Sequence, residues 1–207
     1  MANKKQLFSL ETVANSLLVA QSSGQCGTCL AVTSSGPREG KSTICQNIAN
    51  VLSQKGRRVL LIDANPYHSL PDSVITENTP TLFDLLANPT ASGDLTSLED
   101  IEFPTIATGS EGDLIVEAPK ALASLIEELD KHFDHVIFDL PAYESVRVTG
   151  IMISIIKDTL LVVKHQGPSN LVIKDTCEGI AQDGGNLLGT VFNRYKSYIP
   201  KFIDDLF

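Results

Sequence analysis

The sequence contains no hydrophobic run long enough to cross a lipid bilayer. Its most apolar stretches, IMISII (151–156) and TLLVV (159–163), are far shorter than the roughly 20 residues that a membrane-spanning helix needs. The first residues, MANKK, are followed by mixed polar residues rather than by the apolar stretch of a signal peptide. We therefore expect a cytoplasmic protein that reaches the inner face of a membrane only through a partner.

The chain also lacks an excess of basic residues. Its formal charge is −9 and its pI is about 4.8. The densest basic cluster, KGRR (55–58), falls in an expected turn rather than on a long face. An acidic surface repels the phosphate backbone of nucleic acids. The charge balance therefore argues against a nucleic-acid partner.

Cysteine is scarce, and the sequence completes no zinc site around it. Cys26 and Cys29, two of the four cysteines, have the CxxC spacing, but no second pair or histidine follows at a zinc-binding distance. We interpret this segment as the entry to a strand, with reduced thiols, and keep a redox or metal role as the weaker alternative.

What the chain does contain is a regular alternation of apolar runs and helical patterns. We expect strands at 28–33, 58–63, 105–109, 135–141, 158–165 and 186–193. We expect helices at 10–21, 41–55, 81–88, 118–133 and 169–182. This alternation predicts an α/β fold of three layers, with a mostly parallel central sheet and helices on both faces. The length fits one domain over 1–207, with a lead-in over 1–27 and a short tail over 195–207.

The stretch TSSGPREGKST (33–43) follows the first expected strand and opens a helix, the context of a phosphate-binding P-loop. Lys41 would neutralise the β and γ phosphates of a nucleotide, and the Ser42 hydroxyl would bind Mg²⁺. The alternative is a glycine-containing turn with Ser and Thr near a helix cap. The residues of this loop expected to hold the nucleotide are Gly36, Pro37, Arg38, Glu39, Gly40, Lys41, Ser42 and Thr43.

Two residues of this loop depart from the usual P-loop pattern. Ser35 replaces the first glycine, at a place where a small residue is enough. Arg38 stands in the crowded centre of the loop, and a positive φ there would cost about 1–2 kcal/mol. Its guanidinium group would either help to neutralise the phosphates or extend into solvent.

Two further apolar runs end in aspartate. Asp139 closes HVIFD (135–139) as a Walker B acid would, and Asp63 closes VLLID (59–63). The alternative for each is a strand-terminal residue that caps a turn. We predict Lys41, Asp63 and Asp139 as catalytic residues, with Asp63 accepting or orienting the proton of an attacking hydroxyl. The predicted Mg²⁺ ligands are Ser42, Asp63 and Asp139.

The segments TSSGPREGKST, VLLIDANPYHS, VIFDLPA and LLGTVFNR together resemble the bacterial tyrosine kinases (BY-kinases), over about residues 28–194. These belong to a deviant class of P-loop ATPases that includes partition and division-site ATPases. The resemblance implies that Lys41, Ser42 and Asp139 bind MgATP, that Asp63 is the base for a tyrosine hydroxyl, and that Asn193 contacts adenine. For Asn193 the alternative is a polar residue that closes a strand.

The resemblance also implies a function and a partner. It suggests a tyrosine autokinase that controls exopolysaccharide or capsule synthesis and export. A separate membrane chain-length (co-polymerase) protein would activate it. Tyr195 and Tyr198 are candidate phosphoacceptors, or otherwise tail aromatics that pack on the core.

The chain departs from the family pattern at three places. The motif Asp-x-Asp-x-Arg reads DANPY (63–67), so Asn65 replaces an acid and Tyr67 replaces the arginine. The ring-forming Glu-x-x-Arg-x-x-Arg motif aligns with Glu11, Ala14 and Leu17, so both of its arginines are missing. Self-association is therefore left open. The signature lysine of the partition ATPases would fall at Gly36 and is therefore absent, which, with the acidic charge, argues against a role in DNA partition. The alternative function is therefore a degenerate, non-catalytic module that responds to nucleotide.

Overall fold

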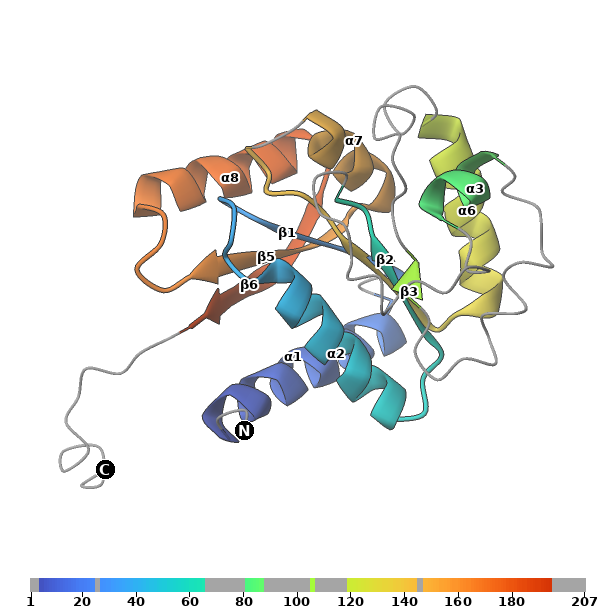
Figure 1. Ribbon diagram of the computed structural model, residues 1–207, viewed down its shortest axis with the longest axis horizontal. Helices are drawn as coiled ribbons and strands as arrows, with labels where there is room; N and C mark the ends of the chain where they lie inside the picture. Colours follow the sequence, from blue (N-terminus) through green and yellow to red (C-terminus); the bar gives the residue numbers. More distant parts are fainter. Residues whose placement is uncertain are drawn as a thin grey trace.

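The structure is a computed structural model that describes residues 4–24, 27–65, 81–87, 105–106, 119–144 and 147–194 (Figure 1). At its centre is a six-stranded sheet in the order β3-β2-β4-β1-β5-β6, in which every recorded pairing is parallel. The strands are β1 (Cys29–Ser34), β2 (Val59–Asp63), β3 (Thr105–Ile106), β4 (His135–Asp139), β5 (Asp158–Lys164) and β6 (Asn186–Asn193). The predicted parallel sheet is confirmed.

Helices cover both faces of this sheet (Figure 1). They are α1 (Lys4–Ser22), α2 (Lys41–Gln54), α3 (Leu82–Ala87), α6 (Pro119–His132), α7 (Arg147–Ile156) and α8 (Asn170–Gln182). Helices α1 and α2 share one apolar cluster with the sheet, and the other four helices share the second cluster on the opposite face. Strands β1, β2 and β4 are buried along their whole length, as strands covered on both faces must be.

One element was not predicted from the sequence. Residues 151–156 read only as a short apolar run, but they form most of helix α7. Its buried positions Val148, Met152 and Ile156 recur every four residues and pack into the core on the α7 face. Within the run itself only Met152 and Ile156 have this spacing, which is too little to tell a helix from a buried strand. Counting Val148 with them makes the helical pattern visible.

The N-terminal helix extends beyond the predicted range of 10–21. Ala14 and Leu17 are buried in the cluster that α1 shares with α2. These are the two positions where the ring-forming motif carries arginine. In this chain they are packing positions, because a long cation at either one would have to enter the core.

Several expectations fall on residues that the structure does not describe. They are the tail over 195–207 with Tyr195 and Tyr198, the motif residue Tyr67, and Cys26. Cys29 is described: it opens β1 and is buried, as the strand-entry interpretation expects. In the described helices, none is both long and apolar enough to span a membrane.

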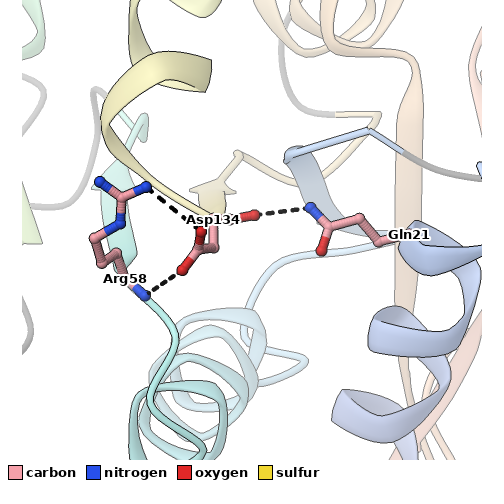
Figure 2. A network of polar contacts seen from close by, with 3 residues as sticks. All are labelled: Gln21, Arg58 and Asp134. Atoms are coloured by element: carbon pink, nitrogen blue, oxygen red, sulfur yellow. Dashed lines mark hydrogen bonds and ion pairs between the residues drawn. The ribbon is translucent and has the colours of Figure 1, made fainter.

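A polar contact network joins three segments at the end of the sheet where strands β2 and β4 begin (Figure 2). The backbone N–H of Arg58 donates to Asp134 Oδ2 at 2.9 Å, and its guanidinium lies 3.5 Å from Asp134 Oδ1. Gln21 Nε2 donates to the Asp134 carbonyl at 2.8 Å. Asp134 therefore connects the end of α1, the start of β2 and the turn before β4.

Replacing Asp134 with Ala is expected to lower the free energy of unfolding by about 1 kcal/mol, because the Arg58 N–H loses its acceptor in a half-exposed setting. Urea denaturation measures the change. Asp175→Ala, at an exposed position of α8, is the matched control and should stay within about 0.5 kcal/mol of the parent. Equal effects of the two substitutions would contradict a stabilising role for Asp134.

Candidate nucleotide-binding site

The loop between β1 and α2 is held in shape by its own hydroxyl and amine groups. Ser34 Oγ donates to the Gly36 carbonyl at 2.6 Å and accepts from Lys41 Nζ at 3.0 Å. Ser35, in place of the first glycine, is fully buried, so only a small side chain fits there. The loop therefore tolerates this departure from the P-loop pattern.

Lys41 is the first residue of α2, and its side chain is only 8% exposed. Burial lowers its pKa, and the opposing charge of Asp139 acts in the other direction, followed by smaller effects from Cys45 and Glu39. A cation kept this far from water gains more than an exposed one from the approach of an anion.

Gly40 adopts a left-handed conformation, with φ 92°, at the N-terminus of α2. A Cβ atom on Gly40 would run into the amide nitrogen of Asn193. That amide Nδ2 donates to the Glu39 carbonyl at 2.8 Å, and its Oδ1 accepts from the Arg194 N–H at 2.8 Å. Asn193 therefore connects the end of β6 to the loop, a role that its position in the sequence did not indicate. Its predicted contact with adenine stays a prediction.

Gly40→Ala is expected to destabilise the protein by about 1–3 kcal/mol, because both the backbone conformation and the contact with Asn193 oppose a side chain. Thermal unfolding measures this loss. Gly56→Ala is the matched control: Gly56 also has a positive φ (76°), but a Cβ there would meet no atom within 4 Å. A loss no larger than that of Gly56→Ala would rule out the steric contribution of Asn193.

The two predicted aspartates end neighbouring strands. Asp63 of β2 and Asp139 of β4 are register partners, and each is 5% exposed. Burial raises the pKa of Asp63 from 3.8 to about 7; the hydrogen bond from the Asn65 N–H, at 3.0 Å, opposes the shift, and the charge of Asp139 adds to it. A carboxyl group with this pKa can accept a proton near neutral pH.

A pocket of about 580 Å³ opens above these strand ends. Its lining residues are Pro37, Arg38, Gly40, Lys41, Ser42, Thr43, Asn65, Pro141, Ala142 and Arg194. Six of the predicted nucleotide-binding residues therefore share one pocket. Gly36, Glu39 and Asn193 lie outside its lining, as do Asp63 and Asp139.

Pro141, Ala142 and Arg194 were not among the predicted site residues. Pro141 and Ala142 lie two and three residues after Asp139. Their closeness to this predicted aspartate was the signal by which the sequence could have placed them at the site. Thr33 Oγ1 donates to the Pro141 carbonyl at 2.7 Å. The Tyr143 N–H donates to the Ser34 carbonyl at 2.8 Å, and its hydroxyl donates to Asp183 at 2.6 Å. These bonds hold the segment after β4 against the phosphate loop.

The residues around the pocket fit a magnesium ion that arrives with a nucleotide. Ser42 is exposed in the pocket lining, and Asp63 and Asp139 provide carboxylate oxygens at two adjacent strand ends. Mg²⁺ in such sites takes one or two protein oxygens together with phosphate oxygens. Within the described ranges, no cluster of three or more His, Cys, Asp or Glu residues forms a metal site from protein groups alone.

A parallel sheet whose first strand leads through a phosphate loop into a helix, with acidic side chains at the adjacent strand ends, defines a P-loop nucleotide-binding protein. The family model described as "CobQ/CobB/MinD/ParA nucleotide binding domain" matches residues 30–206. The chain belongs to this family.

Relatives within this family carry the names of tyrosine kinases. The chain is 25% identical over 169 residues to the putative tyrosine-protein kinase CapB of Staphylococcus aureus, covering 80% of this chain and 74% of that one. It is 27% identical over 170 residues to a putative tyrosine-protein kinase in the cps region of Klebsiella pneumoniae, but spans only 23% of that longer protein. Among solved structures, the BceF tyrosine kinase domain is 25% identical, with a TM-score of 0.73 over 90% of this chain and 76% of that one. The predicted resemblance to bacterial tyrosine kinases is confirmed.

Proposed function

We propose that this protein binds MgATP in the 580 Å³ pocket and acts as a tyrosine autokinase in capsule or exopolysaccharide synthesis. The observation that carries the proposal is the set of Lys41, Asp63 and Asp139 around one phosphate loop, with the two carboxylates in register on adjacent strands. The named tyrosine kinases among its relatives support the choice of acceptor.

Each residue has a defined chemical role in this proposal. Lys41 neutralises charge on the β and γ phosphates. Ser42 and Asp139 hold the magnesium ion, which, when bound, offsets the charge that develops on the phosphate oxygens. Asp63 accepts the proton of the tyrosine hydroxyl as the new oxygen–phosphorus bond forms. The bond between the γ-phosphorus and the bridging oxygen breaks, and its electron pair leaves with ADP.

The proposed partner is a membrane chain-length protein that recruits this chain to the inner face of the membrane. Two relatives bear names that connect them to capsule systems, which supports a partner of this kind. The proposed acceptors, Tyr195 and Tyr198, lie outside the described residues. The positions of the two arginines of the ring motif are occupied by buried Ala14 and Leu17, so any self-association would use other contacts.

One observation favours a second candidate, a nucleotide-responsive module without phosphoryl transfer. Asn65, which lines the pocket, stands where the kinase motif has a second acid. An amide binds Mg²⁺ less strongly than a carboxylate, because it carries no charge. Loss of this charge would weaken metal-assisted transfer while leaving the phosphate loop able to bind.

Incubation with γ-labelled ATP and Mg²⁺ separates the two candidates. The proposal predicts label on tyrosine in the parent protein and in Asn65→Asp, and none in Lys41→Ala. Nucleotide binding without label or released phosphate, with turnover appearing in Asn65→Asp, would instead establish the nucleotide-responsive module. Phosphate released to water without protein label would identify an ATPase and contradict the kinase.

A further inference from the structure

Among the residues that the structure describes, the charged side chains that line the pocket are all cationic. They are Arg38, Lys41 and Arg194. The nearby carboxylates of Glu39, Asp63 and Asp139 are each 4–5% exposed and do not contribute to the lining. The whole chain carries a formal charge of −9, so this concentration of positive charge is local.

Both arginines are held in a conformation that L-residues avoid. Arg38 has φ 60° and Arg194 has φ 56°, both in the left-handed region that residues with a Cβ atom rarely adopt. Such strain persists where the surrounding structure fixes it, and it concentrates at ligand sites. Here the two positive-φ residues come from different segments of the chain and line the same pocket.

A single side chain fixes the backbone beside both arginines. The Asn193 amide donates to the carbonyl of Glu39, the residue after Arg38, and its Oδ1 accepts from the N–H of Arg194 itself. Asn193 is 6% exposed, so these bonds are shielded from water. The pair of arginines is therefore a built feature of the site rather than two independent surface residues.

We propose that Arg38 and Arg194, together with Lys41, neutralise the phosphates of a bound nucleoside diphosphate or triphosphate and so make its binding largely independent of Mg²⁺. Guanidinium groups stay charged at all physiological pH values and bind phosphate oxygens in a bidentate manner. Asn65 on the same lining agrees with this assignment, because a neutral amide there reduces the demand for a metal ion. The inference rests on the proposed nucleotide site and adds how its charge is balanced.

Calorimetric titration of the full chain with ADP, once in Mg²⁺ and once in EDTA, tests the proposal. For the parent protein we expect removal of Mg²⁺ to weaken binding by less than about threefold. Arg38→Gly and Arg194→Gly should each weaken binding in EDTA by roughly tenfold, as loss of a charge-assisted contact would, and by much less in Mg²⁺. Glycine also relieves the backbone strain, so both variants should unfold at the same temperature as the parent or higher.

Arg57→Ala is the matched control, because Arg57 is an exposed arginine at the opposite end of the sheet, before β2 begins. It should leave binding unchanged in both buffers. Asn65→Asp should increase the dependence on Mg²⁺, by weakening binding in EDTA.

Four outcomes would overturn the inference. Unchanged or tighter binding by the glycine variants in EDTA would show that the two arginines extend into solvent and do not bind the phosphates. Equal losses in both buffers would show contacts that do not replace the metal ion. Binding by the parent in Mg²⁺ but not in EDTA would remove the inference and leave the proposed function intact, whereas no binding in either buffer would remove both.

Discussion

Replacing Lys41 with Ala is expected to reduce ATP affinity by at least about 100-fold. The Lys41 amine is buried and lies 3.0 Å from Ser34 Oγ within the loop. A bound phosphate would meet this cation where water screens it poorly. Calorimetric titration with ATP in Mg²⁺ measures the loss.

The same substitution should leave the fold intact. Burial lowers the pKa of Lys41, and the charge of Asp139 offsets this only in part, so we expect the folded protein to gain little from holding this charge in the absence of a ligand. The unfolding temperature of Lys41→Ala should therefore match or exceed that of the parent. Lys55→Ala, at the exposed end of the same helix, is the control for charge alone. Undiminished ATP affinity in Lys41→Ala would refute the phosphate-loop assignment.

Replacing Asp63 with Asn is expected to stabilise the protein at pH 8 and to reduce phosphoryl transfer. The folded-state pKa of about 7 lies above the ordinary value of 3.8. Between these two pH values the folded protein keeps a proton that the unfolded chain releases, so stability falls as the pH rises. Above pH 7 the folded protein bears the full cost of a buried carboxylate, which an amide avoids.

Urea denaturation at two pH values isolates this contribution. Each pKa unit corresponds to about 1.4 kcal/mol of stability. The free energy of unfolding of Asp63→Asn should therefore exceed that of the parent by about a few kcal/mol at pH 8 and by much less at pH 4. The Asn side chain keeps an oxygen that can accept the hydrogen bond from the Asn65 N–H. An advantage that does not change with pH would contradict the raised pKa.

The effect of Asp63→Asn on the reaction should have the opposite sign. Loss of the proton acceptor is expected to slow phosphoryl transfer by about 100-fold or more, with ATP affinity nearly unchanged. Single-turnover assays in excess enzyme separate the two quantities. A variant that transfers phosphate at the parental rate would remove Asp63 from the role of base.

The parts of the fold that were predictable from the sequence are those with a local signal. Strands β2 and β4 are continuous apolar runs that end in Asp63 and Asp139. The predicted end of β2 is correct, whereas β4 ends at Asp139, two residues before the predicted end at 141. The phosphate loop was recognisable because a helix begins at Lys41, directly after Gly40. Helix α7 was missed because its apolar run shows no polar face of its own.

The parts that were not predictable depend on residues far apart in the chain. Arg194 could not be assigned to the site from the sequence. The hydrogen bond that brings its neighbour Asn193 to the loop is made with Glu39, which is 154 positions away in the chain. The raised pKa of Asp63 follows from burial, which the order of residues does not reveal. The cost at Arg38 was stated for the case of a positive φ, and Arg38 does have a φ of 60°. Its place beside Arg194 was not anticipated.

The proposal that this chain transfers phosphate to its own tyrosines is tested most directly by the intact mass of the protein after incubation with MgATP. The account predicts species heavier by whole phosphoryl groups in the parent, mapped by fragmentation to tyrosine, and a single unmodified mass for Lys41→Ala. An unmodified parent protein that nevertheless binds ATP would contradict the kinase and leave a nucleotide-responsive module in its place.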